Sequence, residues 1–488
     1  MLSLAVHRRP EAVFVTTTAV FAIREAAMER TGITRSARLS ELTEAAGVSL
    51  ASGLDGLTVT SVEYDSRKVG AGALFVAIRG LTTDGHRYVG EARRRGAVAA
   101  LVEDTTGESG FPEIVVPDTR AALGLVSHAF YGRPSDRLAT HAITGTNGKT
   151  TTSYLIDSIF RTAGMKTGVV GTLGYRVGDR TFAGDMTSPE SLDLARLLDS
   201  MVASGTDSVA MEVSSHALAL NRTAGMTFDT ATLTNVSRDH LDFHGSIEEY
   251  AAAKALLFDQ IAGDGWKEGA TAIINTDDDF GRRLAARVRG FSNVRLLTYG
   301  WNGADVSVTD ARLTTDGSSV LLGTPSGEVS ADIKLVSVFN VMNALAAAAI
   351  AVSQGIAPEI IGVGLERVDR VSGRLETVDA GQPFAIVVDY AHTPDALAKV
   401  LTALRGTTAR RVITVFGCGG DRDRGKRPMM GEIAASGSDL VFITSDNPRT
   451  ENPGAILEQI AAGARPTGGA FEIVEDRREA IERAVDAA

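Results

Sequence analysis

The stretch that decides the fold is His141-Ala-Ile-Thr-Gly-Thr-Asn-Gly-Lys-Thr-Thr-Thr152, where the hexapeptide GTNGKT stands between a short apolar strand and a helix. Gly145 and Gly148 allow backbone N–H groups to turn inward around phosphate oxygens. Lys149 adds a cation for the β and γ phosphates, and Thr150 offers a hydroxyl to Mg²⁺. The loop is shorter than a full P-loop, because the residue five places before Gly148 is isoleucine and not glycine. The stretch predicts nucleotide binding; the alternative is a glycine turn that binds nothing.

Length and composition describe a multi-domain globular protein. The 488 residues exceed what one hydrophobic core usually supports, and 44% hydrophobic content is ample for folding. The net charge of −11 argues against a general nucleic-acid binder, which needs a concentrated basic surface. No apolar run approaches 18 residues, so we expect no membrane span.

The cysteine content and the first residues of the chain bear on where the protein is located. A single cysteine, Cys418, cannot form an intrachain disulfide, which fits a reducing cytosol. Basic residues 7–9 precede an apolar stretch at 13–23 that faintly resembles a signal peptide. A protein that needs ATP is poorly served outside the cell, so we expect a cytoplasmic protein with residues 1–38 as an extension of uncertain order.

Three α/β units are expected along the rest of the chain. Residues 39–137 alternate short β-like runs with helical stretches and glycine turns, as a smaller N-terminal α/β domain would. Residues 138–369 read as a central doubly wound sheet that contains the phosphate loop. Residues 370–488 read as a Rossmann-like C-terminal domain, because three buried, parallel-type strands each end in polar or glycine residues.

Polar residues close two strands of the central unit. Glu212 ends one apolar strand, and Asn235-Val-Ser-Arg-Asp-His240 follows another. Because the carboxyl ends of parallel strands share one edge, both should face the phosphate loop. Glu212 and His240 could join Thr150 around Mg²⁺, although histidine is an unusual ligand for so hard a cation. Helix capping and a hydrogen-bonded core histidine are the alternatives.

Lys254 falls on the apolar face of the helix predicted over 247–258, so it should point inward. Its aliphatic stem could snorkel to solvent. Burial would instead lower the amine's pKa and leave it free to react. With carbon dioxide it would form a carbamate, an anion able to bind a second Mg²⁺.

Polar turns follow the strands of the outer units as well. In the third unit they are 389–395, 417–427 and Ser445-Asp-Asn-Pro-Arg449, whose amide and guanidinium groups suit a ligand carboxylate. The second of these turns could also be a solvated charge run. In the first unit, Tyr64-Asp-Ser-Arg67 could hold a polar ligand or be a simple turn.

Together these strings resemble the Mur ligase family, the ATP-dependent amide-forming enzymes of peptidoglycan precursor synthesis, over nearly all of residues 39–488. They are most similar to the branch that extends UDP-N-acetylmuramoyl-L-alanyl-D-glutamate. DNPR at 446–449 resembles the version that selects meso-2,6-diaminopimelate over L-lysine. The resemblance implies a monomeric, cytoplasmic ligase of cell wall biogenesis, and so of cell shape and division, with ATP and two Mg²⁺ ions as cofactors.

The resemblance also implies roles for individual residues. The UDP substrate would lie against Tyr64, Ser66, Leu81, Thr82, Thr83, Thr187, Ser188, Ser214 and Arg222. ATP would lie against Gly145, Thr146, Asn147, Gly148, Lys149, Thr150, Thr151, Asn343, Arg374, Asp389 and His392. The incoming amino acid would be held by Arg422, Asp446, Asn447, Pro448 and Arg449. The metal ligands would be Thr150, Glu212, His240 and Lys254 as its carbamate, and the catalytic residues Lys149, Glu212, His240 and Lys254.

The implied reaction is chemically consistent. A carboxylate is a poor acyl donor, so the γ-phosphoryl group would first pass to it and give an acyl phosphate that the amine then attacks. Two Mg²⁺ and Lys149 would offset the repulsion between ATP and the carboxylate. Closure of the third domain would position the amine and exclude water.

Three departures from the family pattern stand out. Met186 replaces a frequent asparagine and Leu220 a frequent glutamine. The family's GKGHE-like string does not occur before Ala488, so we expect either a fragment or impaired amino-acid recognition. The alternatives are the same reaction with L-lysine, a folylpolyglutamate synthase, a P-loop kinase and a nucleotide-binding protein without catalysis.

Overall fold

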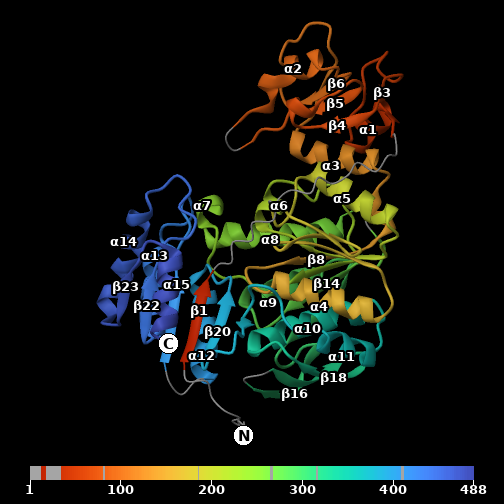
Figure 1. The fold of residues 1–488 in the computed structure, drawn as a ribbon. Helices are drawn as coiled ribbons and strands as arrows, with labels where there is room; N and C mark the ends of the chain where they lie inside the picture. Colours follow the sequence, from red (N-terminus) through yellow and green to blue (C-terminus); the bar gives the residue numbers. More distant parts are fainter. Residues whose placement is uncertain are drawn as a thin grey trace.

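The computed structural model describes residues 12–17, 35–80, 83–184, 186–263, 267–314, 317–407 and 411–488. Its strands form three large sheets and one small two-stranded sheet. The large sheets lie in three units, which Figure 1 shows as an N-terminal unit stacked on the central unit and a C-terminal unit beside the central one. Among the described residues, no helix has the length and apolarity that a membrane span requires.

The N-terminal unit is a parallel four-stranded sheet with the order β4-β5-β6-β7. Every residue of β5 (Ala73–Val76) and β6 (Ala99–Val102) is buried, as expected for strands covered on both faces. The remaining strands are β4 (Ser61–Glu63) and β7 (Glu113–Val115), with β2 (Ala37–Arg38) and β3 (Thr58–Val59) forming the small sheet. The helices are α1 (Leu39–Ala45), α2 (Val89–Arg94) and α3 (Thr119–Phe130).

Helix α3 joins this unit to the central one. It packs on α5 (Ser191–Ala203), and Leu192 of α5 belongs to the N-terminal core. A Cβ at Gly124 of α3 would lie 2.4 Å from the Ala224 carbonyl oxygen, so only glycine allows this close approach. The two units therefore share packed side chains.

The central unit is an eleven-stranded sheet with the order β11-β10-β9-β12-β8-β13-β14-β15-β16-β17-β18. Its parallel middle consists of β9 (Thr167–Gly171), β12 (Ser208–Glu212), β8 (Ala139–Thr144), β13 (Thr230–Leu233), β14 (Thr271–Asn275) and β15 (Arg295–Gly300). Strand β16 (Val306–Leu313) continues the parallel part beside β15. The outer strands pair antiparallel with their neighbours: β10 (Gly174–Val177), β11 (Arg180–Phe182), β17 (Ser318–Thr324) and β18 (Gly327–Ile333).

Helices cover both faces of the central sheet, which confirms the predicted doubly wound architecture. One face packs against α4 (Lys149–Thr162), α10 (Val338–Ser353) and α11 (Pro358–Glu366). The other packs against α5, α6 (Ser215–Ala219), α8 (Ile247–Ala262) and α9 (Asp279–Val288). The short helix α7 (Leu241–His244) precedes α8.

The C-terminal unit is a six-stranded sheet with the order β19-β20-β1-β21-β22-β23, in which β1 spans Ala12–Thr17. Only β19 (Glu376–Val378) is antiparallel to its neighbour in this sheet as described; the others are β20 (Ala385–Asp389), β21 (Arg411–Phe416), β22 (Leu440–Ile443) and β23 (Phe471–Ile473). Its helices are α12 (Pro394–Thr407), α13 (Lys426–Gly437), α14 (Pro453–Ala464) and α15 (Arg477–Asp486).

Strand β1 (Ala12–Thr17) shows that residues 1–38, which we expected to be an extension of uncertain order, include one strand of the C-terminal sheet. It lies in the middle of the C-terminal sheet, where Val13 pairs with Ala385 on one side and Val412 on the other. Figure 1 shows it as a red arrow among blue strands. The sequence AVFVTT has the β-branched and aromatic composition of a strand. Its partners lie more than 360 residues away, so no local pattern announces the pairing.

Candidate active site

The site is built at the carboxyl edge of the central sheet. Strand β8 leads into the phosphate loop and has β12 on one side and β13 on the other. Glu212 is in register with Ile143, and Leu233 with Thr144, so Glu212 and Asn235 flank the loop. This is the arrangement that the strand ends predict.

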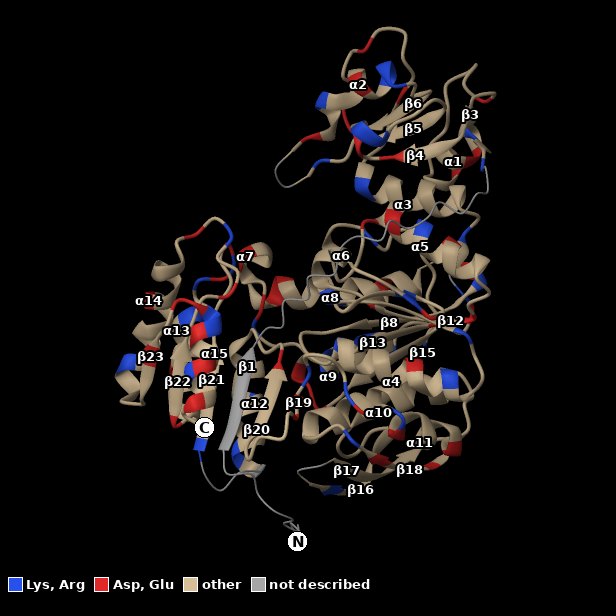
Figure 2. Ribbon diagram, viewed as in Figure 1, with Lys and Arg blue, Asp and Glu red and all other residues tan. Residues whose placement is uncertain are grey.

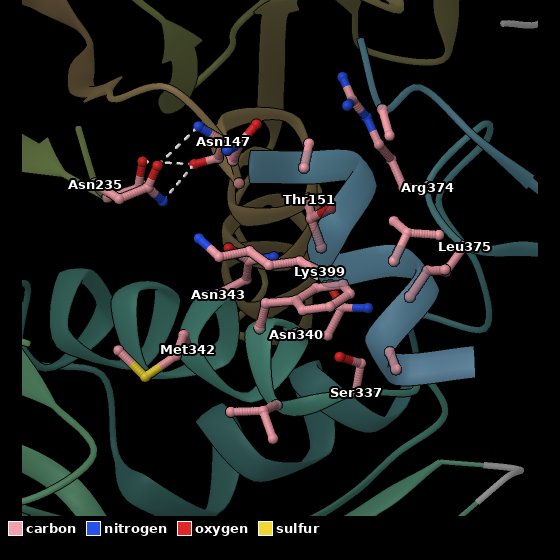
Figure 3. A pocket seen from close by; sticks show the side chains of 18 of the residues that line it. Asn147, Thr151, Asn235, Ser337, Asn340, Met342, Asn343, Arg374, Leu375 and Lys399 are labelled. Carbon is pink, nitrogen blue, oxygen red and sulfur yellow. Dashed lines mark hydrogen bonds between the residues drawn. The ribbon is translucent and has the colours of Figure 1, made fainter. Parts of the chain in front are cut away.

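The phosphate loop adopts a conformation that requires its glycines. Gly148 has φ +91°, and a Cβ there would lie 2.3 Å from Asn343 Oδ1. Asn147 N donates to Asn235 Oδ1 at 3.0 Å, and Asn235 Nδ2 donates to Asn147 O at 3.0 Å (Figure 3). The loop is thereby fixed at the start of α4, whose free N–H groups favour an anion.

The half-buried Lys149 and the buried Lys254 converge on one carbonyl of this loop. Lys149 Nζ donates to Gly145 O at 2.8 Å and to Thr146 O at 2.9 Å. Lys254 Nζ donates to the same Gly145 O at 2.9 Å and lies 4.2 Å from the ring centre of Tyr250. Lys254 is only 1% exposed, as its place on the apolar face predicts.

Burial lowers the pKa of both lysines. For Lys254 the neighbouring Lys149 charge lowers the pKa further, well below its ordinary value. The neutral amine of Lys254 is therefore accessible at a much lower pH than that of a surface lysine. Tyr250 holds the other side of the loop, since its hydroxyl is 3.1 Å from Thr146 Oγ1.

The residues predicted as metal ligands lie around the phosphate loop. Glu212 is 1% exposed and accepts hydrogen bonds from Thr172 N at 2.9 Å and Thr172 Oγ1 at 3.1 Å. Thr150 Oγ1 accepts from Arg374 Nη2 at 2.9 Å. Burial lowers the pKa of His240 to about 3, so its imidazole is neutral and able to bind a cation. The residues predicted as metal ligands thus have suitable donor atoms: hard oxygens of Thr150 and Glu212, and a neutral nitrogen of His240.

A cavity of 660 Å³ adjoins the phosphate loop, between α10 of the central unit and α12 of the C-terminal unit. Figure 3 shows Asn340 and Asn343 of α10 on its floor, with Arg374 across from Asn235. Asn343 Nδ2 donates to Asn340 Oδ1 at 3.0 Å, which fixes both amides. A space of this volume suits a nucleotide base and ribose.

The C-terminal unit closes over this edge and brings the predicted nucleotide residues of both units together. Besides the Arg374–Thr150 bond, Asn147 Nδ2 donates to Asp395 Oδ2 at 3.1 Å. His392 Nε2 lies 3.5 Å from Asp239 Oδ2. Asp389 lines the cavity, but its oxygens accept from Leu375 N and Ala391 N at 2.8 Å each, so it also shapes the backbone.

Four residues predicted to bind the UDP substrate lie together next to Glu212 and Thr172. Ser188 Oγ donates to Glu212 O at 3.0 Å and accepts from Ser214 N at 3.1 Å. Thr187 Oγ1 is 3.1 Å from Thr172 Oγ1. Arg222 donates to Ser188 O and to Glu190, a carboxylate that Arg120 also contacts.

Of the substrate residues expected in the N-terminal unit, the structure describes Tyr64, Ser66 and Thr83. Tyr64 OH donates to Asp193 Oδ2 of α5 at 2.7 Å, at the junction of the two units. Ser66 is buried and its hydroxyl donates to Glu91. Thr83 is exposed, while Leu81 and Thr82 lie outside the described residues.

The predicted amino-acid residues occupy two loops that the structure joins. Gly420 N donates to Asn447 O at 2.8 Å, and Arg449 donates to Gly420 O. Arg427 is fully buried and donates to both Glu451 oxygens, at 3.0 and 2.8 Å. This ion pair holds the loop of Arg422 against the loop of Asp446, Asn447 and Pro448.

Several residues of the site are not predicted from the sequence. Asp239 and Asn235 lie inside a quoted polar run, but nothing in the run distinguishes them from their neighbours. Tyr250 has the spacing of a core residue, and its hydroxyl contact depends on the fold. Arg427 looks like one charge among many in its loop. Figure 2 shows acidic and basic residues intermixed over all three units.

Three family models match the chain: "Mur ligase family, catalytic domain" over residues 58–131, "Mur ligase middle domain" over 143–351, and "Mur ligase, glutamate ligase domain" over 373–488. The chain is 44% identical over 462 residues to the UDP-N-acetylmuramoyl-L-alanyl-D-glutamate–2,6-diaminopimelate ligase of Geobacter metallireducens, covering 91% of this chain and 90% of the relative. The ligase of that name from Solibacter usitatus is 45% identical, with coverages of 88% and 85%. A solved structure of a ligase of that name superposes with a TM-score of 0.68 at 32% identity, covering 93% and 91% of the two chains.

Proposed function

Because the chain belongs to the Mur ligase family, we propose that it joins meso-2,6-diaminopimelate to UDP-N-acetylmuramoyl-L-alanyl-D-glutamate in an ATP-dependent reaction of peptidoglycan precursor synthesis. The observation that supports this most directly is the meeting of the phosphate loop with the C-terminal unit, through the Arg374–Thr150 and Asn147–Asp395 bonds. A ligase must bring a triphosphate, an acid and an amine to one point.

In this proposal the chain's own groups divide the work. The loop from Gly145 to Thr151 holds the phosphates, and Lys149 offsets the charge that develops on them. The adjoining cavity holds the rest of the nucleotide. The γ-phosphoryl group passes to the D-glutamate carboxylate and ADP is the leaving group. The amine then attacks the resulting acyl phosphate, and inorganic phosphate leaves as the amide forms and the amine proton is lost. The Arg427–Glu451 ion pair holds the DNPR loop in place, and this loop orients the carboxylate of the incoming amino acid.

Mg²⁺ would be held by Thr150, Glu212 and His240, with a carbamate on Lys254 for a second ion. Bound Mg²⁺ would supply positive charge between the phosphates and the substrate carboxylate. The buried, low-pKa amine of Lys254 favours carbamate formation, because only the neutral amine reacts with carbon dioxide. We place the reaction in the cytoplasm and expect one chain to suffice, since its three units supply every group named here.

The test is phosphate release by the full chain with ATP, Mg²⁺ and UDP-muramoyl dipeptide, comparing meso-diaminopimelate, L-lysine and no added amine. Rapid release only with diaminopimelate, with formation of the tripeptide, is the expected result. Preference for L-lysine would reverse the amino-acid assignment. A phosphorylated product without amine would indicate a kinase, and ATP binding without turnover a non-catalytic protein.

A further inference from the structure

Asp239 occupies the junction between the central and C-terminal units. It follows β13 and is 3% exposed. Its Oδ2 lies 3.3 Å from His240 Nε2 and 3.5 Å from His392 Nε2, and its Oδ1 lies 4.0 Å from Lys426 Nζ. His240 precedes α7 in the central unit, whereas His392 follows β20 and Lys426 begins α13 of the C-terminal unit.

Burial of a carboxylate is costly unless charges and hydrogen bonds compensate it. The Asp239 oxygens face the side chains of His392, His240 and Lys426, and Oδ1 also accepts a hydrogen bond from His240 N at 2.9 Å. Two of these three groups belong to the C-terminal unit. The Asp239 carboxylate therefore keeps its His240 partners but loses His392 and Lys426 when that unit moves away from the phosphate loop.

A second ion pair joins the same two units, with the charges reversed. Arg238 lies 3.5 Å from Asp423, so successive residues of one central loop contact the same C-terminal loop. That loop also contains Arg422, and the buried Arg427 follows Lys426 directly. A shift of Lys426 away from Asp239 would therefore move the start of α13 and both amino-acid loops.

From these contacts we infer that Asp239 is a positioning residue: it fastens the C-terminal unit over the phosphate loop through His392 and Lys426, and so couples closure to the alignment of the amino-acid loops. This inference rests on the proposed ligase function. It adds a role for a residue that lies between the nucleotide site and the amino-acid site.

A bound cation is the competing explanation of the same cluster. One ligand atom each of Asp239, His240 and His392 lies within 4.8 Å of the others, close enough to hold a metal ion. Lys426, itself 7% exposed, already places an ammonium group beside the carboxylate and would repel such an ion. The ion-pair arrangement is therefore favoured.

The experiment compares Asp239→Asn with Asp242→Asn, a change of an exposed carboxylate three residues away. In ligation assays we expect Asp239→Asn to lower kcat/KM for the amino acid by about 10- to 100-fold. The control should behave as wild type. In small-angle scattering with ADP bound, Asp239→Asn should be more extended than wild type, while its thermal midpoint stays within a few degrees.

A double-mutant cycle measures the coupling between Asp239 and Lys426, which a purely structural role of Asp239 would not produce. Combined with Lys426→Met, Asp239→Asn should cause little further loss, because both changes break one contact. Fully additive losses, or an Asp239→Asn enzyme equal to the control, would overturn the inference. So would Zn²⁺ binding by nucleotide-free wild type that both Asp239→Asn and His392→Gln abolish. Absence of ligation by wild type would instead refute the proposed function.

Discussion

Gly148 shows how one missing Cβ fixes a ligand site. Its φ of +91° and its contact with Asn343 both exclude a side chain. We expect Gly148→Ala to weaken ADP binding at least about 10-fold, because the new methyl group displaces Asn343 or the loop itself. The measurement is ADP affinity by calorimetry.

The matched control is Gly164→Ala, just beyond the other end of α4. Gly164 also has positive φ, +86°, but a Cβ there would meet nothing within 4 Å. Both variants carry a backbone cost of about 1–2 kcal/mol in stability, yet only Gly148→Ala should lose nucleotide. Equal ADP affinities in the two variants would show that the contact with Asn343 is unimportant.

Lys254 is the second prediction at the residue scale. Lys254→Ala should lose ligase activity, and added bicarbonate should not restore it, because the alanine variant has no amine to carbamylate. Wild type depleted of carbon dioxide should regain activity on adding bicarbonate. Full activity of Lys254→Ala would reject the carbamate role and leave the bond to Gly145 as a structural contact.

Residue-scale features were predictable where their signal is local. The inward placement of Lys254 follows from helical periodicity, and the glycines of the loop from their spacing with lysine and threonine. The Asp239–His392 and Arg427–Glu451 contacts are not encoded locally. Each joins residues of separate elements, and the partner of a charged residue is set by the packing of those elements.

At the scale of elements, two buried histidines make helix α3 and strand β8 sensitive to acid. Burial lowers the pKa of His128 to about 3 and that of His141 to about 4. The unfolded chain binds these protons near pH 6.5, whereas the folded chain does not. Above pH 6.5 both histidines are neutral in the folded and the unfolded chain and do not affect stability. Below pH 6.5 protonation favours the unfolded chain, so stability falls down to about pH 4 for His141 and about pH 3 for His128.

The unfolding free energy should fall by about 1.4 kcal/mol per pH unit for each of these histidines below pH 6.5. The free energy of the first urea-induced unfolding transition, measured at pH 5, 6 and 8, gives this slope. His141→Asn keeps a polar group near Thr230 Oγ1, the 3.0 Å partner of His141 Nδ1. It should reduce the slope between pH 6 and 5 without changing it above pH 7. An unchanged slope would mean that β8 opens before the histidine protonates.

Elements were predictable where short apolar runs end in glycine or polar residues, as β8, β12, β21 and β22 do. The antiparallel strands β17 and β18 lack this signature. The alternating burial of β18 comes from one solvent-exposed face, and β1 has the composition of a strand but no local indication of where it pairs.

At the scale of the whole molecule, β1 ties the beginning of the chain to its last unit. The strand hydrogen-bonds to β20 and β21, the two strands that lead into the His392 turn and the Arg422 loop. Without it, two inner strands would become open edges, which are prone to non-native pairing. The C-terminal unit therefore depends on a segment that is separated from it in sequence by both other units.

Val15→Pro tests this dependence through the backbone alone, since proline cannot donate a hydrogen bond in a central strand. We expect faster amide hydrogen exchange in β20 and β21 and loss of ligase activity, with unchanged exchange in β8 and β12. Deletion of residues 1–10, which leaves β1 whole, is the control and should alter neither. Because β20 and β21 hold the turns that meet the phosphate loop, the loss of activity should exceed any loss of ADP binding. Native exchange rates in β20 and β21 of the proline variant would mean that these two strands hold the unit together without β1.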